Sequence, residues 1–217
     1  MSYAAKTSYK KGESDKAYKE DRFSSNYGQY NYKKEIKNVK KILNKIDPNS
    51  TILDIPCGNG RWWKLLSKKA KKIIACDISS GMLKFAAHKK NKFKSKITLK
   101  KSDAEKLQML DKSVDYSFCF ALTKHLPRNI QFKVLKELNR VSKKGIVCTF
   151  PIMNFFTFLI YNLRNKTLKN ELKPIFLNDL KKFLRKSKLE IVFIERNSSF
   201  LGVEHILFLQ NSNFKSK

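Results

Sequence analysis

Short apolar runs alternate with longer amphipathic segments along most of the chain. Each run is nearly continuous in isoleucine, leucine, valine or phenylalanine, which is typical of a strand buried on both faces of a parallel sheet. The segments between the runs place apolar residues three and four positions apart, which is typical of helices that bury one face. Strands are expected at 51–56, 72–78, 96–104 with its exit loop, 113–122 and 143–151. Helices are expected at 32–46, 61–72, 79–90 and 129–141.

The end of the chain departs from this alternation. A further helix is expected at 174–188, and two strands at 189–197 and 204–211 are joined by a short connection, which favours a hairpin. Strands that alternate with helices imply a parallel sheet with right-handed crossovers. The sequence therefore predicts an α/β fold: a Rossmann-like, doubly wound, mostly parallel seven-stranded sheet with a C-terminal antiparallel hairpin.

One domain is expected, because no internal repeat interrupts this order. Residues 1–30 are predicted to be a polar N-terminal extension, 31–211 the domain and 212–217 a tail. The N-terminal segment has no apolar core of signal-peptide length, and the longest apolar run is too short to span a bilayer. We therefore expect a cytoplasmic protein without a transmembrane segment, and the sequence predicts no particular oligomeric state.

Charge and cysteine content bear on the partners. The chain has 47 lysines and arginines against 18 acids, a formal net charge of +29. Such a charge attracts RNA, phosphorylated metabolites or acidic membrane surfaces, or it is spread over solvated faces, and the charge alone does not choose among these. The four cysteines lie in strand-like runs and form no CxxC pair, so we expect buried thiols and no metal site.

The first predicted strand runs into a glycine-rich turn, "ILDIPCGNG". In an open parallel sheet, ligands bind beyond the carboxyl ends of the strands. Gly58 and Gly60 let a ligand approach the backbone, and Asp77 at the end of the second strand can bind ribose hydroxyls. Trp63 stands where dinucleotide-binding turns have a small residue, and Asp54 brings negative charge where a pyrophosphate would lie. The pattern therefore favours a positively charged nucleoside without phosphates.

The ordered set of motifs resembles the class I S-adenosylmethionine-dependent methyltransferases. The motifs are "ILDIPCGNG", "ACDIS", "KSDAEKLQM", "LDKSVDYSFCFALTKHLP", "KELNRVSKKGIVCTFP" and "PIFLNDLKKFLRKSKLEIVFIER". The likeness runs in the family's order from about residue 30 to 210 and is closest to the branch with the ubiquinone and menaquinone biosynthesis enzymes. It departs from the family at Pro56, where glycine is usual, and at "SKKG", where a "KPGG"-like turn is common.

The resemblance implies that S-adenosylmethionine is the cofactor. It also implies which residues bind each part of it: the methionine part by Asp54, Cys57, Gly58 and Gly60; the ribose by Asp77; the adenine by Ile78, Met82, Asp103 and Ala104; and the sulfonium region by Phe120 and Ala121. Ordinary structural roles stay open for some of them. Asp54 and the glycines also suit a turn that binds nothing, Met82 suits the core, and Asp103 suits a solvated loop.

Methyl transfer from a sulfonium depends on alignment of the reactants and exclusion of water. A general base is needed only when the acceptor carries a proton of high pKa. His125, just after the fourth predicted strand, is the candidate catalytic residue for that role. The alternative is a histidine that is hydrogen-bonded in a strand-exit loop.

The acceptor stays open at this stage. "CFALTKH" lacks the "(N/D)PP(Y/F)" motif of nucleic-acid amino methylases, which disfavours that class. The apolar segment 152–166 can form a lid over the acceptor, contact a membrane interface or pack on the sheet. We favour a methyltransferase for a small, lipid-like or anionic molecule. The alternatives are a tRNA methyltransferase of the wobble-uridine type, which the charge and "CGNGR" suit, and a non-catalytic binding module with a cofactor fold.

Overall fold

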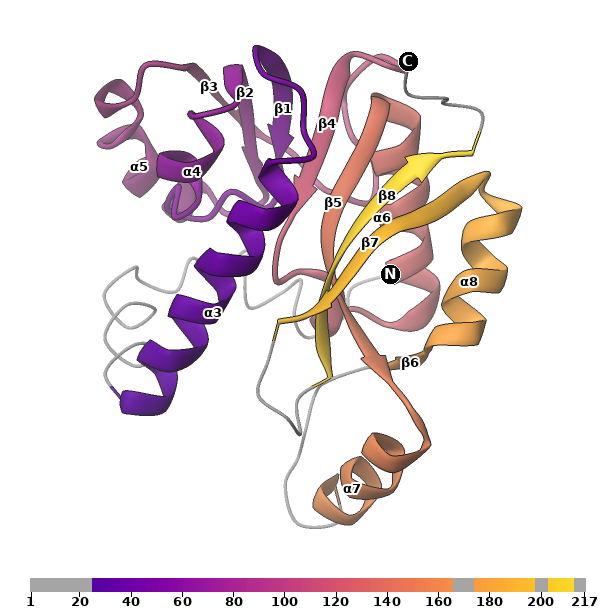
Figure 1. Ribbon diagram of the computed structural model, residues 1–217. Coiled ribbons are helices and arrows are strands. Elements are labelled where there is room, and N and C mark those ends of the chain that lie inside the picture. The colour runs from indigo at the N-terminus through magenta and orange to yellow at the C-terminus, as the bar shows by residue number, and fades with distance from the viewer. Residues whose placement is uncertain (1–24, 166–173, 198–202, 213–217) are drawn as a thin grey trace.

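The structure is a computed structural model that describes residues 25–165, 174–197 and 203–212 (Figure 1). Its strands are β1 Ser50–Asp54, β2 Ala70–Asp77, β3 Lys96–Lys101, β4 Val114–Cys119, β5 Ser142–Met153, β6 Ile175–Phe176, β7 Leu189–Arg196 and β8 Glu204–Asn211. Its helices are α3 Asn26–Leu43, α4 Trp63–Leu66, α5 Ser80–Ala87, α6 Arg128–Val141, α7 Phe155–Asn165 and α8 Leu177–Lys186, with single 3-10 turns η1 Lys90–Lys92 and η2 Thr123–His125.

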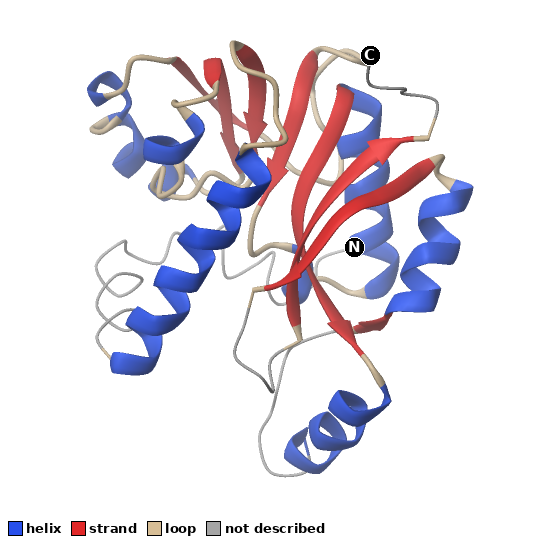
Figure 2. Cartoon of the chain, in the orientation of Figure 1, coloured by secondary structure: helices blue, strands red, loops and turns tan. Residues whose placement is uncertain are grey.

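One mixed sheet forms the centre of the molecule (Figure 2). Its strand order is β3-β2-β1-β4-β5-β8-β7, and the short β6 pairs with β5 beside this path. Strands β1 to β5 pair in parallel, whereas β8 pairs antiparallel with both β5 and β7. The predicted doubly wound sheet with its C-terminal antiparallel pair is confirmed. Because the order reverses between β1 and β4, a ligand site is expected at their carboxyl ends.

Helices cover the two faces of the sheet in separate layers. Ile52 belongs to the apolar cluster that α3, α4 and α5 build on one face, and the next residue, Leu53, belongs to the cluster that α6 and α8 build on the other. Successive side chains of a strand point to opposite faces, so a run that is apolar at every position supplies both layers. This is why the apolar runs in the sequence predicted the parallel strands.

Some element boundaries differ from the predicted ones. The helix expected at 61–72 is reduced to α4, because the chain at Ala70 already pairs with Ser50 as the first residue of β2. Strand β5 continues to Met153, past the predicted end at Pro151, because Ile152 and Met153 pair with β6. The lengthened strand carries α7 away from the sheet (Figure 1).

Helix α3 begins inside the range assigned to the polar extension. Its first turn is capped by the Ser25 hydroxyl, which accepts a hydrogen bond from the Gly28 N–H at 3.0 Å. The rest of the predicted extension, 1–24, and most of the predicted tail, 213–217, lie outside the described residues. The domain boundaries stay predictions.

Membrane and metal features are absent from the described ranges. In them, no helix is both long enough and apolar enough to cross a bilayer. The same ranges contain no group of three or more histidine, cysteine, aspartate or glutamate side chains that could hold a metal ion. All four cysteines are buried and form no disulfide, as the strand-like runs predicted.

Candidate functional site

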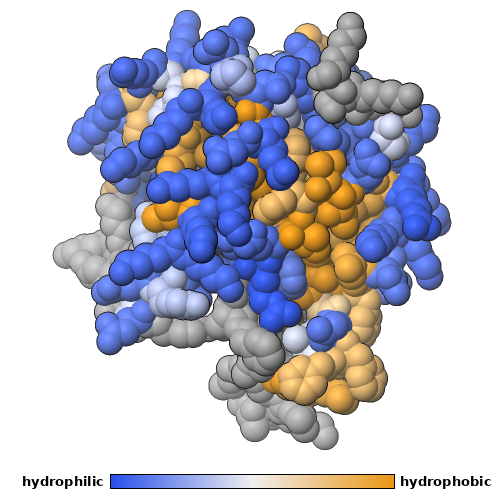
Figure 3. Space-filling view, in the orientation of Figure 1, coloured by the Kyte–Doolittle hydropathy of each residue, from blue (hydrophilic) through white to orange (hydrophobic). Residues whose placement is uncertain are grey.

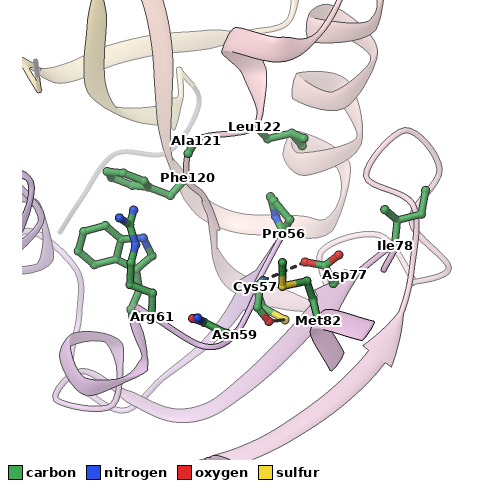
Figure 4. A pocket seen from close by; sticks show the side chains of 12 residues that line it. Pro56, Cys57, Asn59, Arg61, Asp77, Ile78, Met82, Phe120, Ala121 and Leu122 are labelled. Carbon is green, nitrogen blue, oxygen red and sulfur yellow. Dashed lines mark hydrogen bonds between the residues drawn. The ribbon is translucent and has the colours of Figure 1, made fainter. Parts of the chain in front are cut away.

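A pocket opens at the carboxyl edge of the sheet, at the point where the strand order reverses (Figure 4). It encloses about 770 Å³ when its open mouth is included. Three segments form its walls: the turn after β1, the end of β2 with the start of α5, and the segment after β4. The lining residues are Pro56, Cys57, Gly58, Asn59, Arg61, Trp62, Asp77, Ile78, Met82, Phe120, Ala121 and Leu122.

The turn after β1 needs glycine at two positions. Gly58 has a φ of +51° and Gly60 a φ of +76°, a left-handed backbone that is costly for a residue with a side chain. A Cβ on Gly58 would meet no atom within 4 Å, so Gly58 borders open space. A Cβ on Gly60 would lie 2.6 Å from the Trp63 ring, so Gly60 packs on α4 instead.

Asp54 is buried beneath this turn and does not line the pocket. The indole N–H of Trp63 donates a hydrogen bond to Asp54 Oδ2 at 2.9 Å. Burial raises the pKa of Asp54 to about 8, while this hydrogen bond acts to lower it. Trp63 is therefore the partner of the acid, which explains the bulky residue at a position where dinucleotide-binding turns have a small one.

Asp77 connects the end of β2 to the turn. Its Oδ2 accepts a hydrogen bond from the Gly58 N–H at 2.9 Å, and its Oδ1 accepts one from the Ser79 N–H at 2.8 Å. Burial raises the pKa of Asp77, and the two backbone hydrogen bonds oppose the rise. Each carboxylate oxygen has a second lone pair, so Asp77 can still accept hydrogen bonds from a ligand in the pocket that it lines.

A guanidinium stacked on aromatic rings forms another wall of the pocket (Figure 4). The Cζ of Arg61 lies 4.3 Å from the ring centroid of Trp62 and 5.4 Å from that of Phe120. The Nη1 of Arg61 also donates a hydrogen bond to Glu35 Oε2 at 3.0 Å. Helix α3 thereby supplies the counter-charge for a cation at the pocket wall.

The segment after β4 has an unusual backbone at the pocket. Ala121 has a φ of +61°, which is uncommon for a residue with a Cβ, and its N–H donates to Thr149 Oγ1 at 2.7 Å. The ring of Phe120 stacks on that of Phe118, with centroids 5.7 Å apart, and lies 4.6 Å from the ring of Trp62. Contacts to β4, β5 and the β1 turn thus fix the two residues predicted to lie near a sulfonium.

The structure brings most of the predicted site residues together. Those that line the pocket are Cys57, Gly58, Asp77, Ile78, Met82, Phe120 and Ala121. The lining residues that sequence analysis did not assign to the site are Pro56, Asn59, Arg61, Trp62 and Leu122. Each of these is within two positions of a predicted residue in the chain, which was the available signal. The contact of Arg61 with Glu35, 26 positions earlier, has no local signal.

Five predicted residues are not among the residues that line the pocket: Asp54 and Gly60, described above, and Asp103, Ala104 and His125. Asp103 accepts a hydrogen bond from the Glu105 N–H at 3.0 Å, within its own loop. Ala104 packs against the apolar cluster beneath α6. His125 ends η2, and its backbone N–H donates to the Leu122 carbonyl at 3.1 Å. Their roles toward a cofactor or an acceptor stay predictions.

A family model described as a methyltransferase domain matches residues 52–145, a range that includes every residue lining the pocket. Residues 52–145, less than half of the chain, match a methyltransferase domain. This confirms the family that the motifs predicted. The match begins in β1 and ends in β5, so α3, α7 and the C-terminal hairpin lie beyond it.

Two curated relatives of this methyltransferase domain are demethylmenaquinone methyltransferases. The one from Bacillus licheniformis is 31% identical over 139 residues, which cover 59% of this chain and 59% of the relative. The one from Thermobifida fusca is 31% identical over 106 residues, which cover 46% of this chain and 43% of the relative. The matched part of the chain thus spans less than two thirds of the length of either relative.

The fold also matches the crystal structure of magnesium protoporphyrin IX methyltransferase from Synechocystis PCC 6803 with bound SAH. The TM-score is 0.75, and the alignment covers 95% of this chain and 99% of that one at 15% sequence identity. At this identity the likeness concerns the fold. The fold class predicted from the sequence agrees with it.

Proposed function

We propose that this methyltransferase domain binds S-adenosylmethionine in the pocket and transfers its methyl group to a small-molecule acceptor. The observation that carries the proposal is that three features meet where the strand order of the sheet reverses, between β1 and β4. There, the Gly58 turn, the Asp77 carboxylate and the Phe120 ring all face one pocket. The family match over the same residues supports it.

The side chains around the pocket fit the parts of this cofactor. Asp77 offers carboxylate oxygens to the ribose hydroxyls, and Ile78 with Met82 offers apolar surface to the adenine. The turn at Gly58 leaves room for the methionine part, because a Cβ there would meet no atom within 4 Å beyond Gly58 and its two chain neighbours. When bound, S-adenosylmethionine supplies an electrophilic methyl group on its sulfonium. The residues of the chain then serve to hold and align the reactants.

The charges near the pocket favour a cationic ligand. Asp77 borders the pocket and Asp54 lies beneath its floor, whereas the charge of Arg61 is offset by Glu35. Burial raises the pKa of both aspartates, and a cation bound nearby would favour their charged forms. Aromatic faces such as that of Phe120 attract cations as well and exclude water.

For the acceptor, we propose a molecule with an apolar, lipid-like part. Trp62, Phe120 and Leu122 give the pocket a largely apolar wall, which suits such a group better than a strongly hydrated one. The names of both curated relatives agree with this choice. His125 ends η2 one turn after Leu122, and we keep it as the proposed base for an acceptor whose proton must be removed.

The two alternative functions gain no support of their own. The tRNA function depends on the net charge of +29 and on "CGNGR". The non-catalytic binding module is not favoured by the family match. The cytoplasmic location stays a prediction.

Calorimetry with S-adenosylmethionine tests cofactor binding. Asp77→Asn should weaken the affinity about tenfold or more, because a charged acceptor for the ribose hydroxyls is lost. Glu190→Gln, which removes an exposed carboxylate on β7, is the matched control and should leave the affinity unchanged. No binding heat with the unchanged chain, or equal affinities for both variants, would contradict the proposal.

The acceptor class is tested with cofactor that carries a labelled methyl group and with fractionated cell extract. Label is expected in the lipid or small-molecule fraction. Transfer to the RNA fraction would favour the tRNA alternative. Binding without transfer to any fraction would favour the non-catalytic one.

A further inference from the structure

Helix α7 presents an apolar face to solvent. Phe155 is 72% exposed, Phe156 58% and Leu159 45%. Residues three and four positions apart lie on one side of a helix, so these side chains form one apolar patch, which we call the α7 patch. Figure 3 shows apolar surface gathered over α7 at the lower end of the molecule. Large apolar side chains exposed together usually mark a contact surface.

The α7 patch is held in place by contacts on the opposite side of the helix. The Thr157 N–H donates to Asn154 Oδ1 and the Asn154 N–H donates to Thr157 Oγ1, both at 2.8 Å, so the helix start is capped in both directions. Phe158 lies against Phe176 of β6, with ring centroids 5.5 Å apart. Because Thr157 is buried and Phe158 partly buried, the exposed face is a fixed outward side of the helix.

The charge of this segment indicates the kind of surface that the patch meets. Helix α7 contains Arg164 and no aspartate or glutamate, within a chain of net charge +29. Anionic lipid attracts basic residues by about 1 kcal/mol each near the surface. Exposed phenylalanines followed by basic residues are typical of helices that lie in the interface of an anionic bilayer. RNA would satisfy the charge but would leave the aliphatic part of the patch in water.

The position of α7 relates the patch to the pocket. Helix α7 follows the carboxyl end of β5, and β5 is parallel to β4, whose carboxyl end borders the pocket. The patch and the pocket therefore belong to the same end of the sheet (Figure 1). A bilayer in contact with α7 would lie at the end of the sheet from which a lipid-like acceptor enters.

We propose that α7 docks this protein on anionic bilayer surfaces, with Phe155, Phe156 and Leu159 inserted among the lipids. Only the purpose of this docking, the delivery of a lipid-like acceptor, rests on the proposed function. The docking itself can be measured without cofactor or acceptor.

Vesicle co-sedimentation of the full chain tests the docking. The probes are vesicles of phosphatidylcholine alone and of phosphatidylcholine mixed with phosphatidylglycerol. The unchanged chain should bind the mixed vesicles more tightly than the neutral ones. A variant with Phe155→Ser, Phe156→Ser and Leu159→Ser should lose about tenfold or more of its affinity for the mixed vesicles, because three apolar side chains no longer enter the lipid.

Leu110→Ser is the matched control, since Leu110 is 82% exposed and lies outside α7. It should bind the mixed vesicles as the unchanged chain does. Absence of vesicle binding by the unchanged chain would overturn the proposal, as would equal binding by the triple variant or an equal loss in Leu110→Ser. Thermal unfolding checks that the variants fold. Calorimetry with S-adenosylmethionine on the triple variant should give unchanged affinity, which separates failure of docking from failure of the proposed function.

Discussion

Asp54 and its neighbours in β1 show how the pleat of a strand decides the role of a side chain. Asp54 is two residues after Ile52, so both side chains point to the face covered by α3, α4 and α5. Trp63 of α4 belongs to the same apolar cluster. The carboxylate therefore meets the indole N–H beneath the turn, while the backbone of the turn is left to face the pocket.

Trp63→Phe should lower the free energy of unfolding by about 2 kcal/mol, because the buried Asp54 Oδ2 loses its donor while an aromatic ring remains. Urea denaturation measures the change. Trp62→Phe is the matched control, since it shortens the neighbouring indole in the same way without touching Asp54. If both variants lose the same free energy of unfolding, the effect comes from the smaller ring and not from the hydrogen bond to Asp54.

Stability should fall as the pH rises toward 8. Burial raises the pKa of Asp54 from its ordinary 3.8 to about 8, so over this interval the folded chain holds a proton that the unfolded chain has released. Asp54→Asn keeps an acceptor for Trp63 and carries no charge, so it removes this loss. The advantage in Tm of Asp54→Asn over the unchanged chain should therefore grow from about pH 5 to about pH 8.5. Thermal unfolding across buffers measures it, and a constant advantage would refute the assignment.

At the residue scale, the sequence predicted the positions that the backbone motif defines. Gly58 and Asp77 were identifiable because a glycine turn and a strand-end acid follow apolar runs. The partner of Arg61 was not identifiable, because the ion pair joins residues that are distant in the chain and meet only when α3 packs on the sheet. Side-chain pairing of this kind depends on tertiary packing.

Among the elements, α3 connects the pocket wall with strand β7 at the edge of the sheet. Its Glu35 pairs with Arg61 at the pocket wall, and its Lys41 pairs with Glu195 of β7, with N to O distances of 3.0 and 2.7 Å. The helix was predicted from its apolar spacing, which Val39 and Ile42 carry into the core. The shortness of α4 was not predicted, because the lysines after it suit a helix as well as the start of β2.

Glu35→Gln should lower the free energy of unfolding by about 3 kcal/mol, because it removes the carboxylate from a largely buried ion pair with Arg61. Glu195→Gln breaks the more exposed pair with Lys41 and is expected to cost less than about 1 kcal/mol. Urea denaturation of both variants gives the comparison. Equal losses of stability in the two variants would contradict the prediction, because burial would then not strengthen the pair at the pocket wall.

On the scale of the whole molecule, the chain is strongly basic, whereas the pocket has acidic side chains in and beneath its lining. The chain carries a net charge of +29, yet two aspartates are buried at the pocket, Asp77 in its lining and Asp54 beneath it. The net charge therefore indicates which partners the outer surface attracts, but it does not indicate the chemistry of the pocket.

The C-terminal hairpin completes the sheet beyond the segment that the family model matches. β8 pairs along β5 from Gly145 to Pro151, and Asn38 of α3 donates to the Arg196 carbonyl at 3.0 Å. A fragment trimmed to residues 52–145 would end in β5, leave β4 as an open edge and strip Arg61 of its carboxylate partner. Open edges recruit strands from other chains. We therefore expect the segment that holds the pocket to need the preceding helix and the closing hairpin, and a transplant of this site into another scaffold should include both.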